Sequence, residues 1–137
     1  MAYIPDSLRQ LVVERANGCC EYCLIAQSDN LFAHEVDHII AEKHRGATTG
    51  DNLCLSCFEC NRHKGSDFAS FDPLTGEVAM LFNPGHDRWS DHFQLDGALI
   101  RPLSPQGRVT VFLLHFNDES RLRERAALIA ARRYPPA

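Results

Sequence analysis

The sequence predicts an α+β domain that is built around a structural zinc site, on three observations. Two C-x2-C pairs, Cys20–Cys23 and Cys57–Cys60, have the ligand spacing of a site with four thiolates. Short apolar and β-branched segments that are typical of strands lie between and after these pairs, and segments with helical periodicity flank them. No linker or repeat interrupts the 137 residues, so we expect one domain over residues 1–137.

The first element is a helix over residues 5–17. Pro5 suits a first helical turn, the apolar residues Leu8 and Val12 follow the helical period, and Asn17 with Gly18 ends the helix. Further along the chain we expect a strand or hairpin arm over 32–40, a turn-rich loop over 45–51, a strand over about 53–56 and a short helix over about 61–69.

The C-terminal half begins with a predicted turn over 72–76. Asp96-Gly97 between two apolar segments predicts a hairpin over 93–100. Ser104 and Pro105 have the residue types of an N-cap and a first helical position. The helix that they open should have one apolar face, and a last helix should span 119–133. The residues expected on that face are Val109, Phe112, Leu113 and Phe116.

Composition excludes several classes of protein. The net charge of −4 argues against a generally basic surface that coats nucleic acid. No apolar run reaches the roughly 18 residues of a membrane span, and no apolar leader is visible. We therefore expect a cytoplasmic protein without membrane contact. In that reducing compartment, six clustered cysteines favour metal binding over disulfides.

The cysteine sequence allows two arrangements of the second pair, because Cys54 and Cys57 also form C-x2-C. We favour Cys57 with Cys60, since residues 53–56 have the character of a strand in which Cys54 packs. In that arrangement Cys19 and Cys54 are spare thiols. The alternative, Cys54 with Cys57, stays open.

Three further motifs lie between and just after the cysteine pairs: Asp37-His38-Ile39, Asp51-Asn52-Leu53, and Asn61-x2-Lys64-Gly65 directly after Cys60. In this order and spacing, the segment resembles the HNH (ββα-metal) endonuclease family, in its zinc-knuckle branch, and short bacterial HNH proteins in particular. The resemblance implies a ββα-metal core over residues 20–65, with residues 72–137 packing on it as a C-terminal extension.

The resemblance also implies the site. His38 would be the general base that activates water, and Asn52 would tie the loop and hold His38 in place. Asp37 and Asn61 would bind one Mg²⁺ or Mn²⁺ ion, with Asn61 at the position of the family's final motif histidine. The structural Zn²⁺ would be bound by Cys20, Cys23, Cys57 and Cys60. Adjacent residues of a strand point to opposite faces, so Asp37 and His38 share one pocket only where the backbone bends.

Residues after Asn61 are candidates for contact with nucleic acid. Lys64, three residues on, shares its helix face and is placed to hold a phosphate, and Arg62 adds positive charge. His63 lies about 200° round the helix from Asn61, so we expect a surface or nucleic-acid contact rather than a metal ligand. Near the C-terminus, Arg121, Arg125 and Arg132 form a stripe that is either a solvated helix face or a phosphate-binding surface.

The function expected from these features is metal-dependent hydrolysis of phosphodiester bonds in DNA, or RNA, without a small-molecule cofactor. Because the chain is acidic, binding should be weak and salt-sensitive. The alternative is a non-catalytic zinc-knuckle module that binds nucleic acid.

Overall fold

A computed structural model describes residues 3–137, and it confirms the α+β class. Within this range no helix has both the length and the apolar character that crossing a bilayer requires. The helices are α1 (Asp6–Arg15), α2 (Phe58–Lys64), α3 (Trp89–His92), α4 (Pro105–Leu113) and α5 (Glu119–Ala130). The strands form three antiparallel hairpins: β1 (Glu35–His38) with β2 (Leu53–Ser56), β3 (Ala69–Phe71) with β4 (Val78–Met80), and β5 (Phe93–Asp96) with β6 (Leu99–Pro102).

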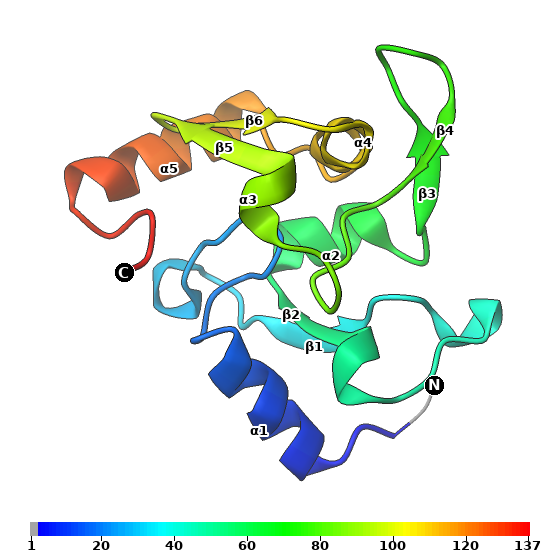
Figure 1. Ribbon diagram of the computed structural model, residues 1–137. Helices are drawn as coiled ribbons and strands as arrows, with labels where there is room; N and C mark the ends of the chain where they lie inside the picture. The colour runs from blue at the N-terminus through cyan, green and yellow to red at the C-terminus, as the bar shows by residue number, and fades with distance from the viewer. Residues whose placement is uncertain (1–2) are drawn as a thin grey trace.

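The β1–β2 hairpin lies between α1 on one side and α2 on the other (Figure 1). Its register pairs Asp37 with Cys54 and His38 with Leu53. Val12 of α1 packs with Leu53 and Leu55 of β2 in one of two buried apolar clusters, and all three side chains are fully buried. This packing fixes β2 on α1, and pairing with β2 then fixes β1, the strand that carries Asp37 and His38.

Helix α2 begins and ends earlier than the expected 61–69. The chain turns into the helix at Cys57, whose Sγ accepts a hydrogen bond from the Cys60 N–H at 3.5 Å. It ends at Gly65, which has a φ of +52° that favours glycine, and Ala69 already belongs to β3. The shift places Asn61 in the middle of α2 rather than at its start.

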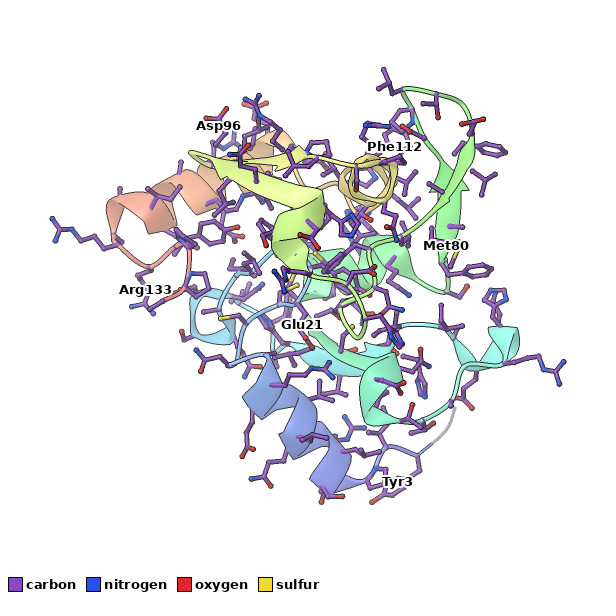
Figure 2. The ribbon with its side chains drawn as sticks, viewed as in Figure 1. Tyr3, Glu21, Met80, Asp96, Phe112 and Arg133 are labelled. Atoms are coloured by element: carbon purple, nitrogen blue, oxygen red, sulfur yellow. The ribbon has the colours of Figure 1, made fainter. Side chains whose placement is uncertain are left out.

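The second half of the chain forms the upper part of the molecule in Figure 1, where β5–β6, α4 and α5 lie above α2. Ser104 caps α4 as expected, because its Oγ accepts from the Gly107 N–H at 2.9 Å. Val109 and Phe116 are buried, but Phe112 is 62% exposed and points away from the core (Figure 2). The expected apolar face of this helix is therefore narrower than its periodicity indicates.

The predicted turn over 72–76 joins β3 to β4, a hairpin that periodicity did not reveal. Its anchor is Asp72, which is 1% exposed and caps the turn by accepting from the Leu74 N–H at 2.9 Å. Arg108 of α4 binds both carboxylate oxygens of Asp72, with its Nη2 2.8 Å from Oδ2. This ion pair docks the hairpin onto α4.

The arginine stripe of α5 is neither of the two surfaces expected for it. Arg121 and Arg125 are 6% and 2% exposed, whereas Arg132 lies beyond the helix and is exposed. Arg125 donates to the carbonyl oxygens of Ala98 and Phe116, both at 2.7 Å. Because these guanidinium groups bind backbone carbonyls inside the protein, they hold α5 in place and are unavailable to phosphate.

Candidate metal and active site

Four cysteine side chains from two distant segments converge on one point. Their Sγ atoms all lie within 4.8 Å of one another, and the residues, all buried, are Cys20, Cys23, Cys57 and Cys60. A tetrahedral zinc with bonds of about 2.3 Å separates its sulfur ligands by roughly 3.8 Å. The Sγ atoms of Cys23 and Cys57 are 3.7 Å apart. The donor set and its spacing therefore fit a structural Zn²⁺.

The choice between the two cysteine arrangements follows from the same geometry. Cys54 lies outside the cluster, with its Sγ 3.6 Å from the hydroxyl oxygen of Tyr22. Burial raises the pKa of the Cys54 thiol to about 12. Cys54 is thus a packed thiol on β2, and Cys57 with Cys60 forms the second knuckle.

A buried cation lies against the cluster. Nη2 of Arg121 donates to the Sγ of Cys60 at 3.2 Å, and Nη1 donates to the Leu114 carbonyl oxygen at 2.8 Å. Burial lowers the pKa of Arg121, but the neighbouring thiols of Cys60, Cys23 and Cys57 more than offset that effect, and the pKa is raised overall. Four thiolates around Zn²⁺ sum to −2, so this guanidinium compensates part of the buried charge.

The first knuckle is held from three sides. The Tyr134 hydroxyl, near the C-terminus, donates to the Cys23 carbonyl oxygen at 2.7 Å, and Trp89 Nε1 donates to that of Tyr22 at 2.8 Å. Glu21, labelled in Figure 2 between α1 and the upper part of the molecule, accepts from the Leu55 N–H at 3.0 Å and from Arg15 at 2.9 Å. These contacts connect the first cysteine pair to β2, α1, α3 and the C-terminal segment.

A second candidate site, formed by carboxylate and amide oxygens, lies on the side of β1 that faces α2. Glu35 and Asp37 alternate with Val36 and His38, so the two carboxylates share one face of the strand. Asn61 reaches this face, because its Nδ2 donates to Oε2 of Glu35 at 3.0 Å. An amide oxygen and carboxylate oxygens are ligands suited to Mg²⁺ or Mn²⁺.

His38 points into the loop that follows β1. The residue is 7% exposed, and its Nε2 lies 2.9 Å from Oγ1 of Thr48. Within residues 3–137, Nδ1 of His38 has no hydrogen-bond partner. When Nε2 carries the proton and donates it to Thr48, the lone pair of Nδ1 is left for another group.

Asn52 closes the same loop with three hydrogen bonds. Its Oδ1 accepts from the Ile40 N–H at 2.9 Å, and its Nδ2 donates to the carbonyl oxygens of Ile40 at 3.0 Å and Ala47 at 2.8 Å. The loop packs so closely that a Cβ on Gly46 would lie 1.7 Å from the Ile40 carbonyl oxygen. Asn52 therefore ties the two ends of the segment that carries Thr48.

Two cavities border β1. One, of about 490 Å³, is lined by Asp37 and His38 together, because it follows the free edge of the strand where side chains from both faces meet. The other, of about 380 Å³, is lined by Asn61. Glu35 lines both cavities. At the wall of the first, Nδ1 of His34 is buried without a hydrogen-bond partner among the described residues.

The three residues expected to contact nucleic acid have different surroundings. Lys64 is 5% exposed, and its Nζ donates to the Ile39 carbonyl oxygen at 2.8 Å. Burial lowers the pKa of Lys64. His63 stacks on His115 with ring centroids 4.1 Å apart, and Arg62 is exposed beside Glu59. In this arrangement Lys64 ties α2 to the end of β1, and Arg62 is the cation that reaches solvent.

Sequence reasoning missed three residues of these sites. Glu35 could have been identified from the sequence, because Glu-x-Asp on a strand places two carboxylates on one face. Thr48 lies in an irregular loop where spacing carries no information about side-chain contacts. Arg121 appeared to belong to a charged helix face, and nothing in the local pattern indicates that it lies against cysteines some 60 positions earlier.

Comparison with known proteins gives two matches. The HNH endonuclease family matches residues 20–67. The Septu protein PtuB of Bacillus thuringiensis is 26% identical over 117 residues, which is 84% of this chain and 43% of PtuB. The chain thus spans less than half the length of that curated relative. No solved structure matches significantly.

Proposed function

Because residues 20–67 match the HNH endonuclease family, we propose that this chain is a metal-dependent nuclease that hydrolyses phosphodiester bonds in DNA. His38 is the general base, Asp37 and Asn61 bind the catalytic ion, and Asn52 holds the loop. The observation that carries the proposal is the contact of Asn61 with Glu35, which brings α2 to the face of β1 that bears Asp37.

The proposed reaction begins at His38. With Nε2–H donated to Thr48 Oγ1, the Nδ1 lone pair takes a proton from water. The resulting hydroxide attacks phosphorus, the bond from phosphorus to the leaving oxygen breaks, and that oxygen leaves with a proton from solvent. Asn52 acts indirectly, because it fixes the loop on which Thr48 lies.

Asp37 and Asn61 supply the oxygen ligands for a divalent cation. Glu35, which is hydrogen-bonded to Asn61, adds a second carboxylate to this site. The bound cation would polarise the scissile phosphate and stabilise the leaving oxygen. Oxygen donors favour Mg²⁺ or Mn²⁺, whereas the thiol cluster favours Zn²⁺. The proposal thus assigns the two metals to different tasks, folding for zinc and hydrolysis for magnesium or manganese.

The net charge of the chain is −4, so its surface as a whole does not attract a polyanion. Binding of the substrate therefore depends on individual cations near the site. Arg62 is the exposed cation beside Asn61, and its ion pair with Glu59, at 3.1 Å, is exposed on both sides. Exposed pairs of this kind hold their partners weakly. We therefore propose that Arg62, and not Lys64, contacts the phosphate backbone, with His63 at the margin of the contact.

The test is plasmid cleavage by the wild-type chain and by His38→Ala, each with EDTA, Mg²⁺ or Mn²⁺. We expect the wild type to cleave with either cation, EDTA to abolish cleavage, and His38→Ala to lose roughly 100-fold or more of the rate while keeping its zinc. His86→Ala is the matched control, because His86 is an exposed histidine outside the proposed machinery. It should cleave like the wild type.

Two results would contradict the proposal in different ways. Equal cleavage by His38→Ala and the wild type would remove His38 as the base. Zinc-loaded wild type that binds DNA but leaves it intact with either cation would instead support the non-catalytic zinc-knuckle module.

A further inference from the structure

Two phenylalanines stand together on the surface beside the proposed active site. Phe32 and Phe58 are 52% and 40% exposed, and their ring centroids are 4.7 Å apart. Phe32 lies in the loop before β1, and Phe58 is the first residue of α2. Adjacent exposed aromatic rings form an apolar surface patch, a feature that often marks contact with another molecule.

Arg62 adds a positive charge beside the two phenylalanine rings. The guanidinium carbon of Arg62 lies 5.6 Å from the centre of the Phe58 ring, one helical turn away. Two aromatic rings beside a guanidinium plane present flat faces with both dispersion and cation–π attraction. These are the side chains on which unpaired nucleobases stack in proteins that bind single strands.

The aromatic pair is continuous with the proposed catalytic site. Both phenylalanines and Arg62 line the cavity of about 380 Å³, and so do Asn61 and Glu35. This volume is within the range of small-ligand pockets. A base in the cavity would lie against the aromatic rings with its edge toward Glu35.

We propose that the cavity formed by Phe32, Phe58 and Arg62 is a subsite for an unpaired nucleobase of a single-stranded or locally unpaired substrate. The inference rests on the proposed nuclease function and specifies the form of its substrate. A base inside a duplex is stacked on both sides and cannot enter, so the subsite selects unpaired segments.

The charge of the cavity favours a base over a phosphate. Glu35, which lines the cavity, would repel an anion, and Arg62 is already paired with Glu59. A neutral base with exocyclic amino groups meets no such repulsion and can donate to the carboxylate of Glu35. The aromatic surface and the acidic wall thus fit the same ligand.

The experiment measures binding of fluorescein-labelled 12-mers of DNA and of RNA to the His38→Ala variant of this 137-residue chain with Ca²⁺, which prevents cleavage. Phe32→Ala should weaken binding of the single strands by about 5- to 100-fold, the usual effect of removing one stacked base. Phe32→Trp should restore it. Phe71→Ala is the matched control, since Phe71 is 66% exposed and lies outside the cavity. Zinc content, measured on each variant, verifies the fold.

An abasic 12-mer separates stacking from charge, because it keeps the phosphates and lacks the bases. We expect Phe32→Ala to bind the abasic strand and duplex DNA as the parent protein does. Equal affinity of Phe32→Ala and its parent for the single strand would overturn the subsite, and so would an equal loss on the abasic strand. Neither result affects the proposed nuclease function, which plasmid cleavage by the wild type decides separately.

Discussion

Nε2 of His38 and Oγ1 of Thr48 lie 2.9 Å apart, and this contact joins β1 to the loop that Asn52 closes. A histidine acts as a base at one nitrogen only when the other carries the proton. Thr48 can accept that proton's hydrogen bond, and in the proposed mechanism this contact leaves Nδ1 of His38 as the basic nitrogen. In this arrangement Thr48 is a positioning residue.

Thr48→Val should therefore slow DNA cleavage about tenfold, through loss of one orienting hydrogen bond to the base. The effect should fall on kcat, with KM for DNA unchanged, because Thr48 is not proposed to touch substrate. Thr48→Ser keeps the hydroxyl and should restore the rate. A steady-state measurement of kcat and KM for the three proteins checks this, and equal kcat values for valine and threonine would contradict the role of the hydroxyl.

The cysteine cluster predicts a sharp difference between two neighbouring cysteines. Cys57→Ser should lose zinc and unfold at a lower temperature, because a structural zinc contributes directly to folding. Cys54→Ser should keep about one zinc per chain, since its thiol lies outside the cluster. Metal analysis and thermal unfolding of both variants measure the difference. If Cys54→Ser lost zinc and Cys57→Ser retained it, the assignment of Cys57 and Cys60 as the second ligand pair would be wrong.

A further prediction concerns the effect of Arg121 on the affinity for zinc. Arg121→Met removes the donor to Cys60 and leaves the buried thiolates without their neighbouring positive charge. Outer groups of this kind typically change metal affinity by about 10- to 100-fold, so zinc should pass to a chelator correspondingly more readily. Arg123→Met, which alters an exposed arginine of the same helix, is the control. Competition with a chromophoric chelator compares the variants.

Patterns of residue type and spacing predicted the parts of the structure that depend on short stretches of chain. The C-x2-C pairs indicated the thiol cluster, Asp96-Gly97 indicated the β5–β6 turn, and Ser104 indicated the start of α4. Each of these features rests on one turn or one repeated spacing. The start of α2 was predicted too late because the cap of this helix is a cysteine sulfur, which does not belong to the usual capping residues.

Long-range electrostatics account for what the sequence did not reveal. Arg121 and Arg125 look like surface charges on a helix, but tertiary contacts with carbonyls and thiols bury them. Lys64 is buried in the same manner against Ile39. A charged residue is assigned to the surface by default, and only the folded chain shows which carbonyl groups its charge satisfies.

The Asp72–Arg108 ion pair predicts how stability changes with pH. Hydrogen bonds from Arg108 hold the pKa of Asp72 at about 2, below its value of about 3.9 in an unfolded chain. A carboxyl whose pKa is lower in the folded state stabilises that state above the unfolded pKa, and this contribution is lost as the pH falls toward the folded value. Asp72→Asn should thus be less stable than the wild type at pH 7.

The difference in unfolding free energy between the two proteins should stay constant from about pH 7 to pH 5 and shrink between about pH 4 and pH 2. Urea unfolding at each pH measures this difference. Asp96→Asn is the control, because Asp96 pairs with Arg101 on the surface, where ion pairs contribute little. A difference that is unchanged down to pH 2 would show that the charge of Asp72 does not anchor the β3–β4 hairpin to α4.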